Sequence, residues 1–201
     1  MQEHFNYVKT TKVWDYRVVD NFWIGGRYPA PNLSNGYHAI LKQWWECYKP
    51  EEDLSVLLVS ESNQVKEFFN QTYPRWLIKT IDLFPEIAND KNNVDIVADI
   101  CAPSATEMIS ERFDLIINQA TLEHVYDPFG AMRNLCSLLA SSGVIVNHTH
   151  PPGFPYHAYP HDYFRFMIDW WPLLENKISY IKLKELVMVN NRQVFSCYQR
   201  V

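Results

Sequence analysis

Short, uninterrupted apolar runs that alternate with helix-like stretches constrain the fold of this chain more than any other feature. The first run covers residues 55–59, and a helix-like stretch over residues 64–71 follows it. The later runs cover residues 76–81, 94–98, 113–117 and 143–147, and a second amphipathic stretch covers residues 128–140. A continuous apolar run predicts a strand buried on both faces. Strands that alternate with helices predict a parallel sheet with helices on both sides.

The C-terminal part of the chain predicts a different connection. Two strand-like runs, over about residues 179–189 and 194–199, are joined through Asn190-Asn191. That connection is too short for a crossover helix, so the two strands should pair antiparallel. A further helix is expected from near Asp162 through Trp171. The sequence therefore predicts an α/β fold with a seven-stranded, mostly parallel sheet, an antiparallel C-terminal hairpin and one antiparallel strand at the edge.

No linker, repeat or low-complexity tract divides the 201 residues, which predicts a single domain over residues 1–201. Residues 1–33 are aromatic and irregular, and Gly25-Gly26 together with nearby prolines marks a loop. Ser34 is placed to cap a helix that runs to about Tyr48. We therefore expect an N-terminal cap and helix over residues 1–50 and an α/β core over residues 51–201.

Composition and charge narrow the class of protein. The chain is 47% hydrophobic and 20% charged, with a formal net charge of −5 at pH 7. We therefore expect a soluble globular protein without general nucleic-acid binding. There is no run of about 18 apolar residues and no pattern typical of a secretory signal, so a cytoplasmic protein without membrane contact is expected. Four scattered cysteines predict neither a zinc site nor a disulfide framework.

Polar side chains follow several of the predicted strands, at the edge of the sheet where ligands bind in such folds. Asp82 and Asp99 each end an apolar run. A carboxylate there can accept two hydrogen bonds from a ribose diol or one from an adenine amine, but it could instead cap a helix or face solvent.

Glu123-His124 follows the fourth strand. His124 could act as an acid, a base or a positioning group near a ligand, or the pair could only orient its loop.

The stretch from Asn147 to Arg165 is the densest in potential chemistry. It contains four of the seven histidines, namely His148, His150, His157 and His161, among prolines that disfavour a helix. Because it follows the fifth strand, we expect it to form the acceptor side of a pocket, with His157 as the first and His161 as the second candidate for a general base. A purely structural lid is the alternative. Imidazoles and Asp162 are competent metal ligands, but no spacing matches a standard zinc signature, so no metal is predicted.

Two motifs resemble those of a known enzyme family. Phe113-Asp-Leu-Ile-Ile with Leu122-Glu-His-Val-Tyr-Asp-Pro-Phe129 is similar to a fourth-strand motif and its LEHV-x-DP continuation. Tyr156-His-Ala-Tyr-Pro-His-Asp-Tyr-Phe-Arg-Phe166 is similar to an H-x-x-P-x-D-Y-x-R segment that follows the fifth strand. Residues from about 55 to 200 thus resemble the class I S-adenosylmethionine-dependent methyltransferases of the broad type-11 group. The resemblance implies a Rossmann-like methyltransferase fold and S-adenosylmethionine as the cofactor.

The resemblance also implies roles for individual residues. Asp82 would bind the ribose hydroxyls of the cofactor and Asp99 its adenine amine, while Ile100 would pack on the adenine ring. The position of Asn118 after the fourth predicted strand, rather than the resemblance, places it on the same rim as a further predicted cofactor contact.

The loop after the first strand departs from the family pattern. In the family this loop is rich in glycine and admits the methionine part of the cofactor. Here Ser60, Glu61 and Ser62 occupy the loop and are the predicted contacts. Ser60, Ser62 and Gln64 stand at the three glycine positions, and Leu58 stands where the family has an acidic residue.

The leading functional hypothesis is S-adenosylmethionine-dependent O-methyl transfer to a hydroxyl group of a small molecule or a glycan. Such a transfer needs an in-line nucleophile, a base for its proton and exclusion of water. The predicted catalytic residues are His157, His161 and Asp162, and the predicted substrate-binding residues are His124, Tyr163 and Arg165. Arg165 could instead pair structurally with Asp162.

Two other functions compete with this hypothesis. The first is a methyltransferase-fold protein that has lost methyl transfer and acts as a binding or partner subunit, which would account for the missing glycines. Its aromatic N-terminus (Trp14, Tyr16, Phe22 and Trp23) could form an interface in a homo- or hetero-oligomer, or could instead cover the core. The second, a dinucleotide-dependent oxidoreductase, is disfavoured because no G-x-G-x-x-G motif is present.

Overall fold

The computed structural model describes residues 17–19, 37–84, 94–157 and 160–201. Its strands are β1 (Arg17–Val19), β2 (Ser55–Val59), β3 (Leu77–Asp82), β4 (Ile96–Val97), β5 (Phe113–Gln119), β6 (Leu139–Thr149), β7 (Ile181–Val189) and β8 (Gln193–Arg200). Its helices are α2 (Tyr37–Tyr48), α3 (Asn63–Thr72), α4 (Ser104–Met108), the short η1 (Leu122–His124), α5 (Pro128–Ser137) and α6 (Trp170–Lys177). Ser34 and the aromatic N-terminal residues lie outside the described part of the chain.

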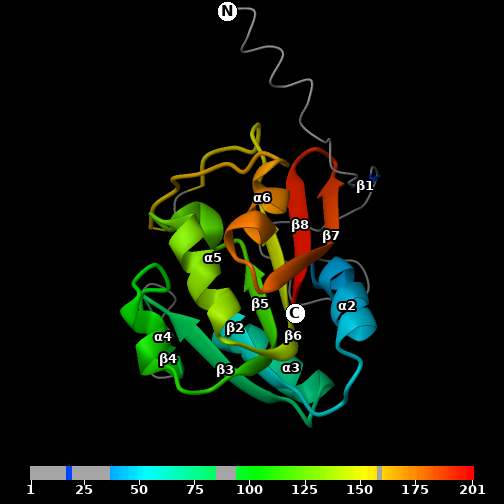
Figure 1. The fold of residues 1–201 in the computed structure, drawn as a ribbon, viewed down its shortest axis with the longest axis vertical. Helices are drawn as coiled ribbons and strands as arrows, with labels where there is room; N and C mark the ends of the chain where they lie inside the picture. Colours follow the sequence, from blue (N-terminus) through cyan, green and yellow to red (C-terminus); the bar gives the residue numbers. More distant parts are fainter. Residues whose placement is uncertain (1–16, 20–36, 85–93, 158–159) are drawn as a thin grey trace, which may run out of the picture.

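The strands form one sheet in the order β1-β7-β8-β6-β5-β2-β3-β4 (Figure 1). All pairs of neighbours are parallel except β6–β8 and β7–β8, which are antiparallel. The predicted α/β fold is confirmed: β2 to β8 form the seven-stranded, mostly parallel sheet with its antiparallel C-terminal hairpin. β1 adds an eighth strand beside β7. The expectation of an antiparallel strand at the edge was wrong, because β8 lies between β6 and β7.

The hairpin between β7 and β8 follows from its two-residue turn. Asn190 and Asn191 both have a φ of 52°. Two successive residues with positive φ are typical of a type I′ turn, which matches the twist of antiparallel strands, and asparagine tolerates this region better than most residues. The turn closes with a hydrogen bond of 3.0 Å from the Arg192 amide to the Val189 carbonyl. The predicted antiparallel pairing thus has a local cause.

Two predicted helices have other bounds. The helix expected over residues 128–140 ends at Ser137, because Leu139 already pairs with Phe113 of β5 as the start of β6. The helix expected from near Asp162 begins only at Trp170. Asp162 does not cap a helix, because its carboxylate accepts hydrogen bonds from Arg165 and from the His157 amide, 2.7 Å away. The segment before α6 therefore remains irregular.

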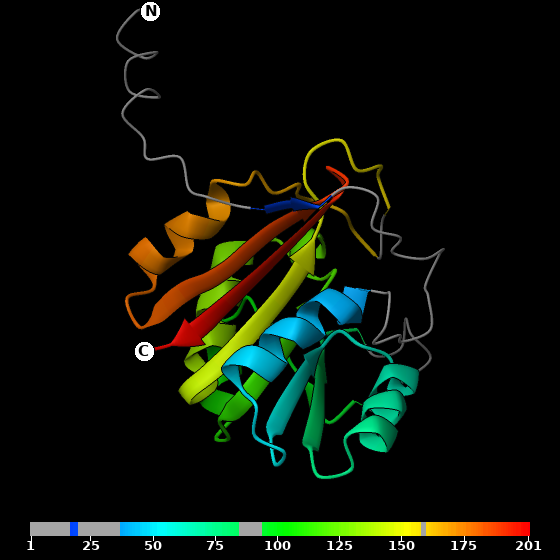
Figure 2. The same ribbon diagram turned by 90° about the vertical axis from the view of Figure 1, so that its right-hand side faces the viewer.

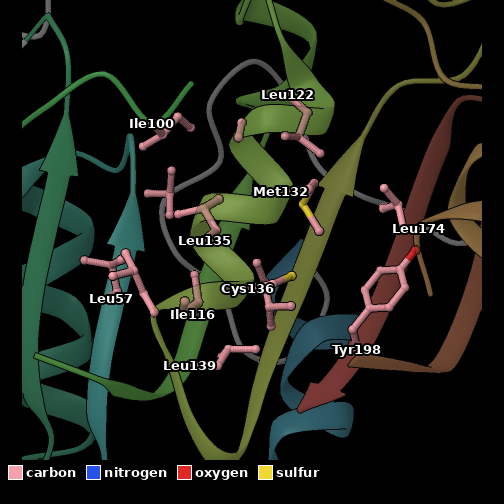
Figure 3. Packing of buried hydrophobic residues seen from close by; sticks show 14 of the residues in the cluster. Leu57, Ile100, Ile116, Leu122, Met132, Leu135, Cys136, Leu139, Leu174 and Tyr198 are labelled. Atoms are coloured by element: carbon pink, nitrogen blue, oxygen red, sulfur yellow. The ribbon is translucent and has the colours of Figure 1, made fainter. Parts of the chain in front are cut away.

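Helices cover both faces of the sheet (Figure 2), as the alternation of apolar runs predicts. Within β2, Val56 and Leu58 pack with α2 and α3 on one face, whereas Leu57 and Val59 pack with α4, α5 and α6 on the other. All four side chains are fully buried. Figure 3 shows part of the second cluster, in which Met132 and Leu135 of α5 lie over the sheet. Burial on both faces explains why these strands read as continuous apolar runs.

The search for membrane-spanning segments covered the described residues. None of the helices there combines the length and the apolar character needed to cross a bilayer.

Candidate functional site

The carboxyl ends of β2, β3, β5 and β6 lie at the same edge of the sheet, and the loop after β6 runs over this edge (Figure 1). The strand order reverses between β2 and β5, and ligands bind beside such a reversal in open α/β sheets. The predicted site residues lie at or after the ends of these strands or after the end of β4. We call this edge the carboxyl rim.

The loop after β2 contains no glycine, but one of its residues has a backbone conformation that is typical of glycine. Ser60 has a φ of 53°, in the left-handed region that glycine adopts most easily. Ser62 has an extended conformation with a φ of −69°, and its hydroxyl accepts a hydrogen bond from the Val65 amide as the N-cap of α3. Gln64 is exposed in the first turn of α3. The backbone thus adopts a glycine-like conformation at Ser60, which stands at the first glycine position of the family pattern. Ser62, two residues later, has an ordinary conformation without strain.

Glu61 points into the protein beside a histidine of α2. Its carboxylate lies 3.8 Å from Nε2 of His38, and the two side chains are only 10% and 7% exposed. Within the described residues, neither the Glu61 Oε1 atom nor the His38 Nε2 atom has a hydrogen-bond partner. Polar atoms that are buried without a partner are rare, and they are often found where a ligand or water binds.

Asp82 ends β3, and Asp99 follows the neighbouring strand β4. Asp82 is paired with Val97 across β3 and β4, so Asp99 follows two residues beyond that pair. Asp82 Oδ1 accepts a hydrogen bond of 2.8 Å from the Phe84 amide. Asp99 accepts one of 2.8 Å from the Cys101 amide and one of 3.0 Å from the Tyr126 hydroxyl. Both carboxylates are partly exposed and retain acceptor capacity for a ligand.

Ile100 and Asn118 are more buried than the two aspartates. Ile100 is 7% exposed and belongs to the core cluster under α5. Asn118 donates from Nδ2 to Asn147 Oδ1 at 2.9 Å, whereas its Oδ1 atom has no partner within the described residues. The sequence-based roles of these two residues in cofactor binding remain predictions.

Glu123 is the centre of a cluster of imidazoles on the acceptor side of the rim. Its side chain is fully buried, and its Oε2 atom accepts a hydrogen bond of 2.6 Å from the Thr149 hydroxyl. Three histidine Nε2 atoms face its Oε1 atom, at 3.3 Å for His150, 3.7 Å for His157 and 4.0 Å for His124. We call these four residues the Glu123 cluster. Two segments build it: η1 after β5, and the loop that follows β6.

The electrostatics of the Glu123 cluster favour positive charge near Glu123. Burial raises the pKa of Glu123, but the imidazoles and the Thr149 hydroxyl outweigh burial and hold this pKa below its usual range. The Glu123 carboxylate raises the pKa of His157, whereas burial lowers the pKa of His150 to about 4. His157 is also the most exposed of the three rings, at 34%. Glu123 therefore favours a proton on the ring of His157.

Asp162 and Arg165 fix the shape of the loop. The Asp162 carboxylate is 1% exposed and forms a two-pronged ion pair with the Arg165 guanidinium, which holds its pKa well below the usual range. Arg165 also donates to the carbonyl oxygens of Phe154 and Pro155, at 3.2 and 2.8 Å. These contacts match the structural alternative for Arg165, and they leave Asp162 away from the surface.

The remaining predicted residues lie close by. The His161 ring is exposed, and its backbone carbonyl accepts a hydrogen bond from Nδ1 of His124. Tyr163 is 51% exposed, while its amide donates to the Glu123 carbonyl at 2.8 Å. The structure thus brings His124 and His157 against the Glu123 carboxylate and the Tyr163 amide against the Glu123 backbone. Asp162 and Arg165 contact His157 instead.

Sequence reasoning left Glu123 and His150 out of the predicted site. A charged residue between Leu122 and Val125, in an otherwise apolar motif, was the available signal for Glu123. For His150 the signal was its position directly after the fifth strand. Neither signal shows that the two side chains meet, because the contact joins residues 27 positions apart with a separation of 3.3 Å.

A hollow of about 400 Å³ lies elsewhere, at the opposite end of β2 and β3. Trp45, Lys49, Tyr73 and Trp76 are among its lining residues. None of the predicted site residues lines it, so it is separate from the carboxyl rim.

No protein-family model and no curated protein sequence matches the chain. Several solved structures are similar to the chain. An S-adenosylmethionine-dependent methyltransferase from Clostridium acetobutylicum is similar with a TM-score of 0.62 and 10% identity, over 82% of this chain and 90% of that chain. A SAM-dependent methyltransferase from Aquifex aeolicus has a TM-score of 0.59 and 13% identity, over 82% of this chain and 89% of that chain.

A third similar structure is a coclaurine N-methyltransferase bound to N-methylheliamine and S-adenosylhomocysteine. Its TM-score is 0.61, with 10% identity over 87% of this chain and 76% of that chain. At such low identity the similarity lies in the arrangement of helices and strands. The chain thus has the fold of the class I S-adenosylmethionine-dependent methyltransferases.

Proposed function

We propose that this protein transfers a methyl group from S-adenosylmethionine to a hydroxyl group of a small molecule or a glycan. The fold supports the reaction class, since similar structures are S-adenosylmethionine-dependent methyltransferases. The observation that carries the proposal is the Glu123 cluster, which places a buried carboxylate and three imidazoles on the carboxyl rim.

The cofactor would lie over the ends of β2, β3 and β4. Asp82 would accept hydrogen bonds from the ribose hydroxyls, and Asp99 would accept one from the adenine amine. Ser60, Glu61 and Ser62 would contact the methionine part. The partly exposed Asp82 and Asp99 carboxylates and the positive φ of 53° at Ser60 support this placement.

The acceptor hydroxyl would lie against the Glu123 cluster. Methyl transfer from a sulfonium makes the acceptor oxygen lose its proton, so a proton-accepting or charge-stabilising group must lie beside that oxygen. His157 is the most exposed ring of the cluster and remains the first candidate to meet the acceptor. Asp162 and Arg165 would position His157 through the Asp162 contact with the His157 amide, and His124, His161 and Tyr163 would flank the acceptor.

The test is methyl transfer from S-adenosylmethionine labelled in its methyl group, with panels of small-molecule and glycan hydroxyl acceptors. We expect labelled product with at least one acceptor, and we expect Glu123→Gln and His157→Asn to lower the rate by about 10²–10⁴. Lys182→Ala, at an exposed position of β7, is the control that should keep the wild-type rate. A protein that binds the cofactor but labels none of the acceptors would contradict the proposal and favour the binding or partner subunit.

A further inference from the structure

The geometry around Glu123 suits more than proton transfer. The Oε1 atom of Glu123 is fully buried, and no hydrogen-bond donor within the described residues reaches it. The Nε2 atom of His157 is likewise buried without a hydrogen-bond partner there. His150 Nε2 lies 3.3 Å from the same Oε1 atom. A carboxylate oxygen and two imidazole nitrogens thus face one another, and the Glu123 and His157 atoms among them are buried.

The other nitrogen of each ring is held by a backbone carbonyl. Nδ1 of His150 lies 3.4 Å from the Arg192 carbonyl oxygen, and Nδ1 of His157 lies 3.2 Å from the Pro155 carbonyl oxygen. A carbonyl oxygen can only accept, so each Nδ1 atom carries the proton. In a neutral ring, Nε2 then has its lone pair directed toward Glu123. A backbone carbonyl that fixes the ring in this way is the usual arrangement behind a metal-binding histidine.

Arg165 does not change this assignment for His157. Its Nη2 atom lies 3.4 Å from Nδ1 of His157 and could in principle donate to it. However, the two protons on Nη2 already go to the Pro155 carbonyl oxygen and to Asp162 Oδ2. The Nδ1 atom of His157 is therefore left as a donor to Pro155.

The distances agree with a metal-binding arrangement. The three ligand atoms, Glu123 Oε1, His150 Nε2 and His157 Nε2, all lie within 4.8 Å of one another. Metal–ligand bonds of about 2.0–2.1 Å in a tetrahedral site place ligand atoms about 3.4 Å apart. The separations from Glu123 Oε1 are 3.3 and 3.7 Å, so a small inward movement of the rings would complete the site.

The surroundings hold these ligands in place. The Thr149 hydroxyl binds the other oxygen of Glu123 at 2.6 Å. The His150 ring stacks on Phe154 with a centroid distance of 3.6 Å and an angle of 9° between the planes. Asp162 and Arg165 neutralise each other in an ion pair. The titratable groups that face the Glu123 carboxylate are therefore imidazoles. A buried carboxylate is costly without a cation, and a bound metal ion would supply one.

We propose that Glu123, His150 and His157 bind a divalent first-row transition-metal ion, with a coordination position left open toward the acceptor side of the rim. Two imidazoles and one carboxylate suit zinc, manganese, iron or cobalt, whereas magnesium and calcium prefer oxygen ligands. Three protein ligands with an open position are typical of catalytic rather than structural metal sites. Such an ion would bind and polarise the oxygen of an acceptor hydroxyl.

The metal site does not depend on methyl transfer, and the two proposals can fail separately. Metal binding is measured on the protein alone, whereas binding of S-adenosylhomocysteine is measured by a separate titration. Metal binding without cofactor binding would overturn the proposed function only. Cofactor binding without metal binding would overturn the metal site and leave the Glu123–His157 pair as the proton acceptor.

The experiment is a titration of the full chain, first stripped with a chelator, with Co²⁺ followed by its visible absorption and with Zn²⁺ followed by calorimetry. We expect one ion per chain, and a midpoint of thermal unfolding that rises when Zn²⁺ is added. Glu123→Gln keeps the size of the side chain but removes its charge, and we expect it to weaken the affinity at least about 100-fold, since even the partners behind metal ligands contribute about 10–100-fold.

His157→Asn is the second ligand variant, and its position in a partly exposed loop keeps the test valid if Glu123→Gln does not fold. Tyr156→Ala is the matched control, because this exposed side chain lies in the same loop but not among the three ligands, and it should keep the wild-type metal affinity. Absence of saturable binding by the wild type would overturn the metal site. Equal affinities of the wild type and the two ligand variants would overturn it as well, since the ions would then bind elsewhere.

Discussion

Asp114 at the start of β5 fastens this strand to β2. Its Oδ2 atom accepts hydrogen bonds from the Ser55 amide at 3.0 Å and from the Ser55 hydroxyl at 2.8 Å, and Lys49 Nζ lies 3.4 Å from Oδ1. Burial raises the pKa of Asp114, but the Ser55 and Lys49 contacts outweigh burial and leave this pKa below its usual range. A lowered pKa in the folded state means that the charged carboxylate stabilises the fold at neutral pH.

We therefore expect Asp114→Asn to lower the free energy of unfolding at pH 7 by about 1 kcal/mol. The difference from the wild type should shrink as the pH falls below about 4, the ordinary pKa of an aspartate, and through the lower folded-state value. Urea unfolding at several pH values measures it. Asp169→Asn is the control, since Asp169 makes no capping hydrogen bond. A difference that stays constant down to pH 2 would refute the role of the charge.

Gly143 in β6 is required by close backbone contacts. A Cβ atom at this position would lie 2.8 Å from the Phe113 carbonyl oxygen and 2.9 Å from that of Ala140. Backbone cannot move aside as a flexible side chain does, so we expect Gly143→Ala to lower the free energy of unfolding by about 1–3 kcal/mol. Ser141→Ala, at an exposed position of the same strand, should change it by less than about 0.5 kcal/mol. Equal stabilities of the two variants in thermal unfolding would contradict the close contact.

At the scale of residues, the sequence predicted only part of the site. The order of the residues placed His157 on the acceptor side, because it follows the fifth strand. It did not place His150 or Glu123 in the site, because their roles depend on which atoms meet after η1 and the loop that follows β6 have packed together. Ser60 is a similar case: its φ of 53° keeps the turn expected of a glycine, although its residue type indicates otherwise.

At the scale of elements, α5 depends on Asp127 for its start. The Asp127 carboxylate accepts a hydrogen bond of 2.9 Å from the Gly130 amide, and Pro128 occupies the first turn. Loss of such a cap costs about 1 kcal/mol, so we expect Asp127→Ala to lower the free energy of unfolding by that amount. Asp127→Asn keeps an acceptor oxygen and should stay within about 0.5 kcal/mol of the wild type. A loss as large for Asp127→Asn would show that the charge, rather than the cap, is needed.

Elements with a strong local cause were predicted well. The strand over residues 55–59 is confirmed at the same bounds as β2, and the Asn190-Asn191 turn joins β7 to β8. The helix near Asp162 was wrong, because a contact with Arg165 and the His157 amide holds Asp162 in an irregular segment. A local pattern cannot show that a side chain bonds across a loop rather than within a helix.

At the scale of the whole molecule, the two buried faces of the sheet account for the predictability of the fold. Continuous apolar runs determine which strands lie inside, and the connection lengths determine which of them are parallel. β1 was not predicted, because its three residues lack a distinct apolar run and depend on pairing with β7. The side chains that determine the chemistry of the carboxyl rim come from loops, so the fold alone does not identify the acceptor.

The central claim is that the carboxyl rim binds S-adenosylmethionine, and calorimetric titration with S-adenosylmethionine and S-adenosylhomocysteine tests it most directly. We predict saturable binding of one molecule per chain for the wild type. Asp82→Ala should weaken the binding by about 1–3 kcal/mol through loss of hydrogen bonds to the ribose, and Lys182→Ala should leave it unchanged. Absence of binding by the folded wild type, or equal affinities of wild type and Asp82→Ala, would contradict the account.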